Sequence, residues 1–178
     1  MKRSVRKRVF ATANSVLAAA RAGGLDDAAF RQVGAAKAAG VIARVRGTFA
    51  GGEAPPAGGP LWTRLRGLEL PAAEPHELSA LLALGPPDTP VFLLVEDWER
   101  PKPGWPFWVF EATLAAAVAT LDNHALLEFY LVARSFDWLV AENHHNVLIV
   151  AGDQAASALA RAQGGGRAGR GASRPDAT

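Results

Sequence analysis

The sequence predicts an α+β domain in which N-terminal helices precede a mainly antiparallel sheet of about five strands. Three observations support this fold class: an alanine- and arginine-rich beginning, continuous apolar runs after residue 90, and short connections between those runs. Alanine and arginine favour helices, bounded apolar runs are typical of buried strands, and short connections favour antiparallel pairing. One helix, at about residues 113–123, is expected to cover a face of the sheet.

Two helices are predicted in the first part of the chain. The first spans about residues 4–22 and ends at Gly23-Gly24. Asp26 is predicted to cap a second helix that continues through Ala38. The apolar residues at 41–45 either prolong this helix or begin an extended segment.

Glycine and proline dominate residues 47–60, which therefore read as a linker. Two short helices are expected after it, at about 61–68 and 75–82. Proline at the first turn and Pro86-Pro87 at the end are typical helix boundaries.

The predicted sheet occupies most of the chain after residue 90. Its strands are expected at 91–95, 107–110, 127–132, 136–142 and 147–150. The last two flank the polar sequence Asn143-His144-His145-Asn146, which is typical of a β-hairpin. A final short helix is expected at 155–162.

Charge divides the chain into segments of opposite sign. Residues 1–60 carry ten Lys/Arg against three Asp/Glu, whereas residues 61–163 carry six against thirteen. We therefore predict a basic helical segment (1–46), the linker (47–60), an acidic core domain (61–163) and a disordered Arg/Gly tail (164–178). The acidic balance disfavours nucleic acid as a partner of the core.

Composition bounds the chemistry and the compartment. The sequence has no cysteine, which excludes disulfides and thiolate metal sites and fits the reducing cytoplasm. No apolar run reaches the length of a membrane span, so no membrane partner is expected. No phosphate-binding glycine loop follows a strand and no serine lies in a nucleophile elbow, so no cofactor is predicted. The oligomeric state is left open.

Glu142, His144 and His145 are the candidate catalytic residues. A carboxylate beside two imidazoles is suited to acid–base chemistry or to binding a divalent metal ion. Neighbouring residues on a strand point to opposite faces, and the spacing matches no established metal-ligand pattern, so no metal ligands are assigned. The alternatives are a small metal-dependent hydrolase or nuclease-like enzyme and a polar hairpin tip without catalytic function.

Acidic and aromatic residues near the end of the first strand form a candidate binding surface. The predicted contact residues are Glu96, Asp97, Trp98, Glu99 and Trp105. Aromatic residues are enriched at protein interfaces, and acidic surfaces attract basic partners by electrostatic steering. The favoured prediction is therefore a non-catalytic module that binds another protein, with a basic partner fitting best.

Four blocks of the sequence resemble an uncharacterised bacterial α+β family whose members end in a W-L-x-x-E-N-H-H strand signature. These blocks are Trp98, residues 107–111, residues 128–132 and residues 137–145. The resemblance covers about residues 61–152 and implies a small cytoplasmic α+β protein. The family carries no known activity, so the signature residues inherit no catalytic role from it. In size and architecture the chain is also similar to immunity proteins of bacterial toxin systems, including the group related to yeast cell-wall regulators. That similarity implies an inhibitory or regulatory role toward a protein partner.

Overall fold

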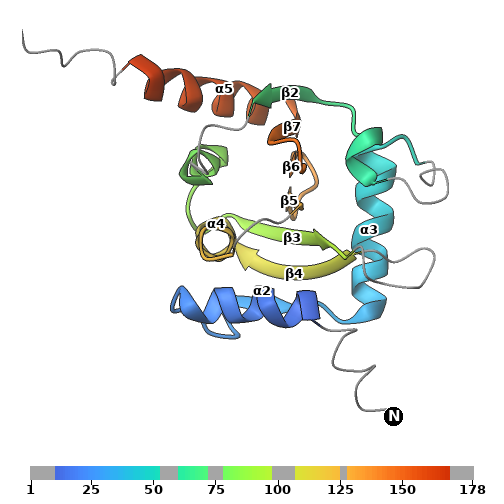
Figure 1. Ribbon diagram of the computed structural model, residues 1–178. Coiled ribbons are helices and arrows are strands. Elements are labelled where there is room, and N and C mark those ends of the chain that lie inside the picture. The colour runs from blue at the N-terminus through green and yellow to red at the C-terminus, as the bar shows by residue number, and fades with distance from the viewer. Residues whose placement is uncertain (1–10, 53–59, 72–77, 98–106, 125–127, 169–178) are drawn as a thin grey trace, which may run out of the picture.

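An antiparallel sheet forms the centre of the computed structural model, which describes residues 11–52, 60–71, 78–97, 107–124 and 128–168 (Figure 1). Within these residues the sheet has seven strands in the order β1-β4-β3-β5-β6-β7-β2. The strands are β1 (Phe30–Gln32), β2 (Leu68–Pro71), β3 (Pro90–Glu96), β4 (Phe107–Thr113), β5 (Phe129–Ala133), β6 (Leu139–Glu142) and β7 (Val147–Ala151). Every neighbouring pair is antiparallel, which confirms the predicted fold class.

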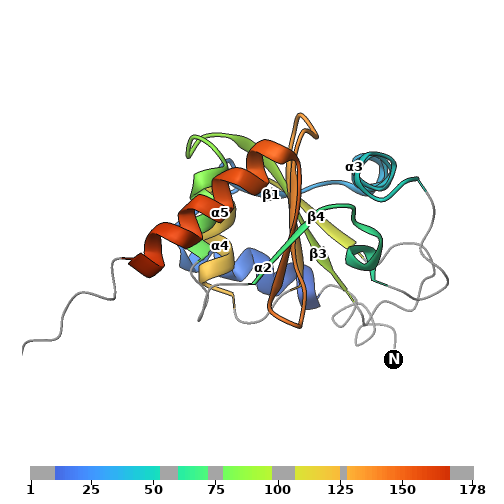
Figure 2. The same cartoon turned by 90° about the horizontal axis from the view of Figure 1, so that it is seen from above.

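Helices cover both faces of this sheet (Figure 2). They are α2 (Ala11–Ala22), α3 (Ala35–Phe49), η1 (Leu61–Arg64), η2 (Leu78–Leu84), α4 (Leu114–Asp122) and α5 (Asp153–Ala168). α2, η2, α4 and α5 lie against one face, whereas α3 and η1 lie against the other. The sheet is therefore the middle layer of three, and its strands are apolar on both sides.

Each face has its own hydrophobic core. In the first core, Val16 of α2, Leu114 and Leu121 of α4 and Leu159 of α5 pack on strand residues such as Leu93. In the second core, apolar residues of α3 pack on the alternate strand residues, among them Val41, Ile42, Val45, Phe92 and Tyr130. Because successive strand residues point to opposite faces, one strand supplies both cores.

The predicted helix at 113–123 is confirmed as α4. Thr113 is its N-cap, and the threonine hydroxyl accepts a hydrogen bond from Ala116 N at 3.2 Å. The hairpin around Asn143–Asn146 is also confirmed, because β6 and β7 pair on either side of it.

The expectation of about five strands is too low, because β1 and β2 were not predicted. Asp26 was expected to cap a helix, but its carboxylate accepts from Ala28 N and Ala29 N in a turn that leads into β1. α3 begins only at Ala35 and continues through the apolar residues at 41–45. At the other edge, the predicted helix at 61–68 stops at Arg64, and the chain enters β2.

The described part of the N-terminal segment belongs to the same hydrophobic cores as the sheet. α2 contributes to the first core and α3 to the second. α5 covers the predicted helix at 155–162 and extends to Ala168, past the predicted start of the tail. The predicted linker at 47–60 begins too early, because residues 47–49 belong to α3. Residues 1–10, residues 53–59 of the linker and residues 169–178 lie outside the described part of the chain.

No helix within the described residues is long and apolar enough to cross a membrane.

Candidate functional site

Strand register brings three strand ends together at one end of the sheet. Val95 of β3 pairs with Phe129 of β5, which pairs in turn with Glu142 of β6. One step further, Glu96 N donates a hydrogen bond to the carbonyl oxygen of Glu128 at 3.4 Å. Glu96 and Glu128 are therefore neighbours, and the tip of the β6–β7 hairpin follows directly.

Tyr130 connects the buried Glu96 to η1. Its hydroxyl donates to Glu96 Oε2 at 3.0 Å and accepts from Trp62 N at 3.1 Å. Strand alternation places Glu96 and Tyr130 on the face of the second core, where η1 also lies. The hydroxyl thereby fixes the start of η1 over the sheet.

The environment of Glu96 brings its titration close to neutral pH. Burial raises the pKa of Glu96 to about 7, and the nearby charge of Glu128 acts in the same direction. The Tyr130 hydrogen bond and the charge of Arg46 partly oppose this rise in pKa. Burial, and next the charge of Glu96, raises the pKa of Tyr130, so its hydroxyl remains a neutral donor.

Glu128 holds His144 at the hairpin tip. Its Oε1 accepts from His144 N at 3.1 Å and contacts Nδ1 of the same imidazole. The Glu128 side chain is 10% exposed, whereas the His144 side chain is 58% exposed. Glu128 therefore orients an outward-facing imidazole and leaves Nε2 outside this contact.

The asparagines of the tip fix its backbone. Asn143 Oδ1 accepts from His145 N at 2.9 Å and from Val147 N at 3.2 Å. Asn146 has a φ of 55°, a left-handed conformation that asparagine tolerates well. These bonds turn the chain so that His144 and His145 are both exposed.

Three aromatic rings meet at this tip and form what we call the hairpin-end surface: Trp62, His144 and His145. The Trp62 ring centroid lies 5.9 Å from each imidazole, in edge-on geometry, and the two imidazoles are 3.9 Å apart. The indole Nε1 of Trp62 and the nearby Arg46 Nε are buried without a hydrogen-bond partner among the described residues. Buried N–H groups are nearly always paired, so these two are notable.

The structure brings together only part of the catalytic set predicted from the sequence. His144 and His145 are adjacent, but strand alternation directs Glu142 to the first-core face, opposite to Glu128. The carboxylate that contacts His144 is Glu128, which the candidate set omitted. Among the described residues, no three histidine, aspartate or glutamate side chains are grouped as a metal ion requires.

The predicted partner-binding residues divide into two groups. Glu96 and Asp97 are buried, and Asp97 Oδ2 accepts from Trp108 Nε1 at 2.7 Å. Trp98, Glu99 and Trp105 lie outside the described residues. Sequence reasoning also missed Tyr130, although its place in an apolar strand beside the one ending in Glu96 was a usable signal.

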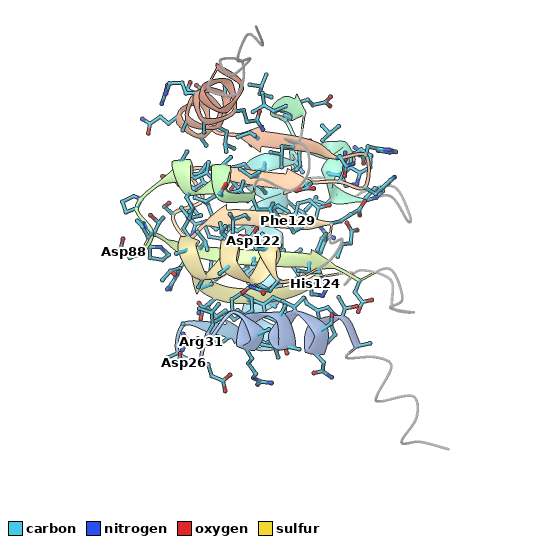
Figure 3. The ribbon with its side chains drawn as sticks, turned by 60° about the vertical axis from the view of Figure 1, so that its left-hand side comes forward. Asp26, Arg31, Asp88, Asp122, His124 and Phe129 are labelled. Carbon is cyan, nitrogen blue, oxygen red and sulfur yellow. The ribbon has the colours of Figure 1, made fainter. Side chains whose placement is uncertain are left out.

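A second polar group lies where α4 meets α2, and Figure 3 shows Asp122 and His124 at this end of α4. His124 Nε2 is 3.0 Å from Ser15 Oγ, and burial raises the pKa of Asp122. The Ser15 hydroxyl already donates to the carbonyl oxygen of Thr12 at 2.8 Å. Its proton is therefore directed into the helix, so this serine is not arranged as a nucleophile.

Comparison with known protein families gives one informative result. A family model described as a family of unknown function, DUF6756, matches residues 13–163. No curated protein and no solved structure matches the chain.

Proposed function

The chain belongs to the DUF6756 family, which has no assigned activity, and from its geometry we propose that it is a non-catalytic module that binds another protein through the hairpin-end surface. The observation that supports this most directly is the exposed His144 imidazole, which Glu128 contacts from beneath and which lies beside His145 and Trp62. Aromatic side chains already held in place lose little conformational entropy on binding, and such residues dominate interface energies.

Charge favours a basic partner. Residues 61–163 carry thirteen Asp/Glu against six Lys/Arg, and Glu128 lies directly beneath the hairpin-end surface. An acidic environment accelerates the approach of a basic protein. The predicted contacts through Trp98, Glu99 and Trp105 remain part of the proposal. Glu96 and Asp97 are buried, so they are proposed to support the surface from beneath and not to contact the partner directly.

Affinity capture of the tagged full chain with a matched pair of variants tests this proposal. His144→Ala combined with His145→Ala removes the exposed imidazoles, whereas His124→Ala removes an imidazole elsewhere, beside α2. A partner retained by the wild type and by His124→Ala, and bound at least about tenfold more weakly by the double variant, is the expected result. Equal retention by all three proteins would contradict the proposal. Near-UV circular dichroism of each variant checks that the fold is intact.

An enzyme is the second candidate, and the Glu128–His144 contact is the observation in its favour. A carboxylate that orients one imidazole nitrogen leaves the other available as a general base. The metal-dependent version predicts saturable binding of Zn²⁺ or Mn²⁺, with about one ion per chain, in calorimetric titration. No measurable binding would remove that version.

A further inference from the structure

A second charged surface surrounds Glu111, about four strand residues away from Glu96 along the sheet. Arg31 of β1 donates to Glu111 Oε2 through Nε at 3.0 Å and through Nη2 at 2.8 Å. Lys37 of α3 bonds Oε1, and the Arg134 guanidinium lies 4.0 Å from the same oxygen. Figure 3 shows Arg31 at this edge of the molecule, close to the turn of Asp26.

Two phenylalanine rings in tilted contact, Phe92 and Phe136, extend this surface beside α3. The Arg44 guanidinium lies 4.3 Å from the centroid of the Phe136 ring, and that of Arg134 lies 5.8 Å from the Phe92 ring. The two ring centroids are 5.8 Å apart, so Arg44 and Arg134 each lie over one ring of a neighbouring aromatic pair. We call Arg31, Lys37, Arg44 and Arg134, together with Glu111, the basic cluster.

The backbone of Phe136, which carries one of these two rings, is strained. Phe136 has a φ of 63°, which is rare for a bulky side chain. Such conformations persist where the surrounding structure requires them, and they recur at binding sites. Here the left-handed turn brings the Phe136 ring onto the face where α3 supplies Arg44.

The cations of the basic cluster are not neutralised by its single carboxylate. Arg31, Lys37 and Arg134 keep 61%, 53% and 51% of their side-chain surface exposed, whereas Glu111 keeps 10%. Asp137 also lies in the β5–β6 turn, where it accepts from Ser135 Oγ at 2.6 Å, and even with this acid the positive charge is in excess. A guanidinium has five N–H donors, and Arg31 uses two groups on one oxygen of Glu111.

We propose that the basic cluster binds an acidic peptide segment of a partner protein. Planar guanidinium groups match carboxylates in shape and charge, and two of the cluster arginines are already oriented by aromatic rings. A carboxylate ligand is favoured over the phosphates of a nucleic acid because Arg31 and Lys37 already bind a carboxylate, that of Glu111, within this chain. A lone phosphate fits less well because the cations converge on Glu111, which occupies the point that the phosphate would need.

Fluorescence anisotropy with a labelled alternating Glu–Ser peptide tests the proposal on the full chain. Arg44→Gln combined with Arg134→Gln is expected to weaken peptide binding at least about tenfold relative to the wild type. The matched control, Arg66→Gln combined with Arg161→Gln, removes the same charge near β2 and on α5 and is expected to bind like the wild type. Raising the salt concentration is expected to weaken the wild-type complex.

Glu111→Gln supplies a readout that a purely structural role would not produce. Because the variant removes the carboxylate that competes with the peptide, it is expected to bind the peptide more tightly than the wild type. The proposal is overturned if the wild type does not bind the peptide, if the two double variants bind equally, or if oligothymidine of equal charge binds more tightly. Thermal unfolding checks each variant, and the two double variants decide the outcome if Glu111→Gln does not fold.

Discussion

Glu96 is a carboxyl group that folding removes from water and places beside a second carboxylate, Glu128. The Tyr130 hydroxyl compensates only in part, so the folded state favours the protonated acid. Tyr130, Glu96 and Trp62 N form one hydrogen-bonded chain. Glu96 is therefore linked to η1 through a single side chain, Tyr130.

The raised pKa of Glu96 predicts that stability falls as pH rises toward neutrality. The folded state retains this proton up to about pH 7, whereas the unfolded chain releases it near pH 4.5. The free energy of unfolding therefore decreases between these values and levels off above the higher one. Urea unfolding at about pH 5 and about pH 7.5 is expected to show roughly 1–3 kcal/mol more loss in the wild type than in Glu96→Gln.

The pKa of Glu111 is shifted in the opposite direction to that of Glu96, so Glu111 does not contribute to the stability change between about pH 5 and about pH 7.5. The Lys37 hydrogen bond lowers the pKa of Glu111, so its contribution is lost only as pH falls below 4.5. An equal pH dependence in the wild type and in Glu96→Gln would contradict the account of Glu96.

The sequence identified the hairpin histidines but not the carboxylate that orients them. His144 and His145 stand out because they lie in a polar turn between two apolar runs. Glu128 precedes His144 by sixteen residues and becomes its neighbour only through the register of β5 and β6. Pairing register is set by the whole sheet, so local sequence reasoning could not supply it.

β1 and β2 are short edge strands, and their brevity explains why the sequence did not reveal them. β1 has three residues and β2 has four, too few to show an alternating pattern. The inner strands were predictable because each is an apolar run between turn residues. A short edge strand can be identified only from the strand it pairs with, and β4 and β7 lie far from β1 and β2 in the sequence.

Two glycines outside the sheet interior predict opposite effects of one substitution. A Cβ at Gly40, within α3, meets open space, whereas a Cβ at Gly67, before β2, would lie 2.4 Å from Val150 O. Gly40→Ala is expected to stabilise the protein by about 0.5–1 kcal/mol, because alanine restricts the unfolded chain and favours the helix. Gly67→Ala is expected to destabilise it, because the β2–β7 pairing must shift.

Chemical denaturation of the two variants measures this difference directly. An unchanged midpoint for Gly67→Ala would show that β2 does not lie against β7 as described. A lower midpoint for Gly40→Ala would indicate a contact on the exposed side of α3.

At the scale of the whole molecule, the sheet needs cover on both faces. α2 lies over the first core and α3 over the second, although the sequence suggested a separate helical segment before a linker. Alanine-rich helices bury little area per residue, so their sequence gave a weak signal of packing. The acidic composition of residues 61–163 is plain in the sequence, but the two cores also include residues of α2 and α3.

Removing residues 1–52 is therefore expected to abolish cooperative folding. The truncated chain would lose α2, β1 and α3 and expose apolar residues of both cores to water. Circular dichroism during heating would show no sharp transition, in contrast to the full chain. A sharp transition in the truncated chain would establish residues 61–163 as an independent domain.

The two edge strands also determine when the sheet can finish pairing during synthesis of the chain. β1 pairs with β4, about eighty positions later, and β2 pairs with β7, which ends at Ala151. A nascent chain on the ribosome therefore carries its first helices and its first edge strand before their partners exist. The sheet closes only after Ala151 has emerged, so the apolar faces of the early segments lack their strand partners until then.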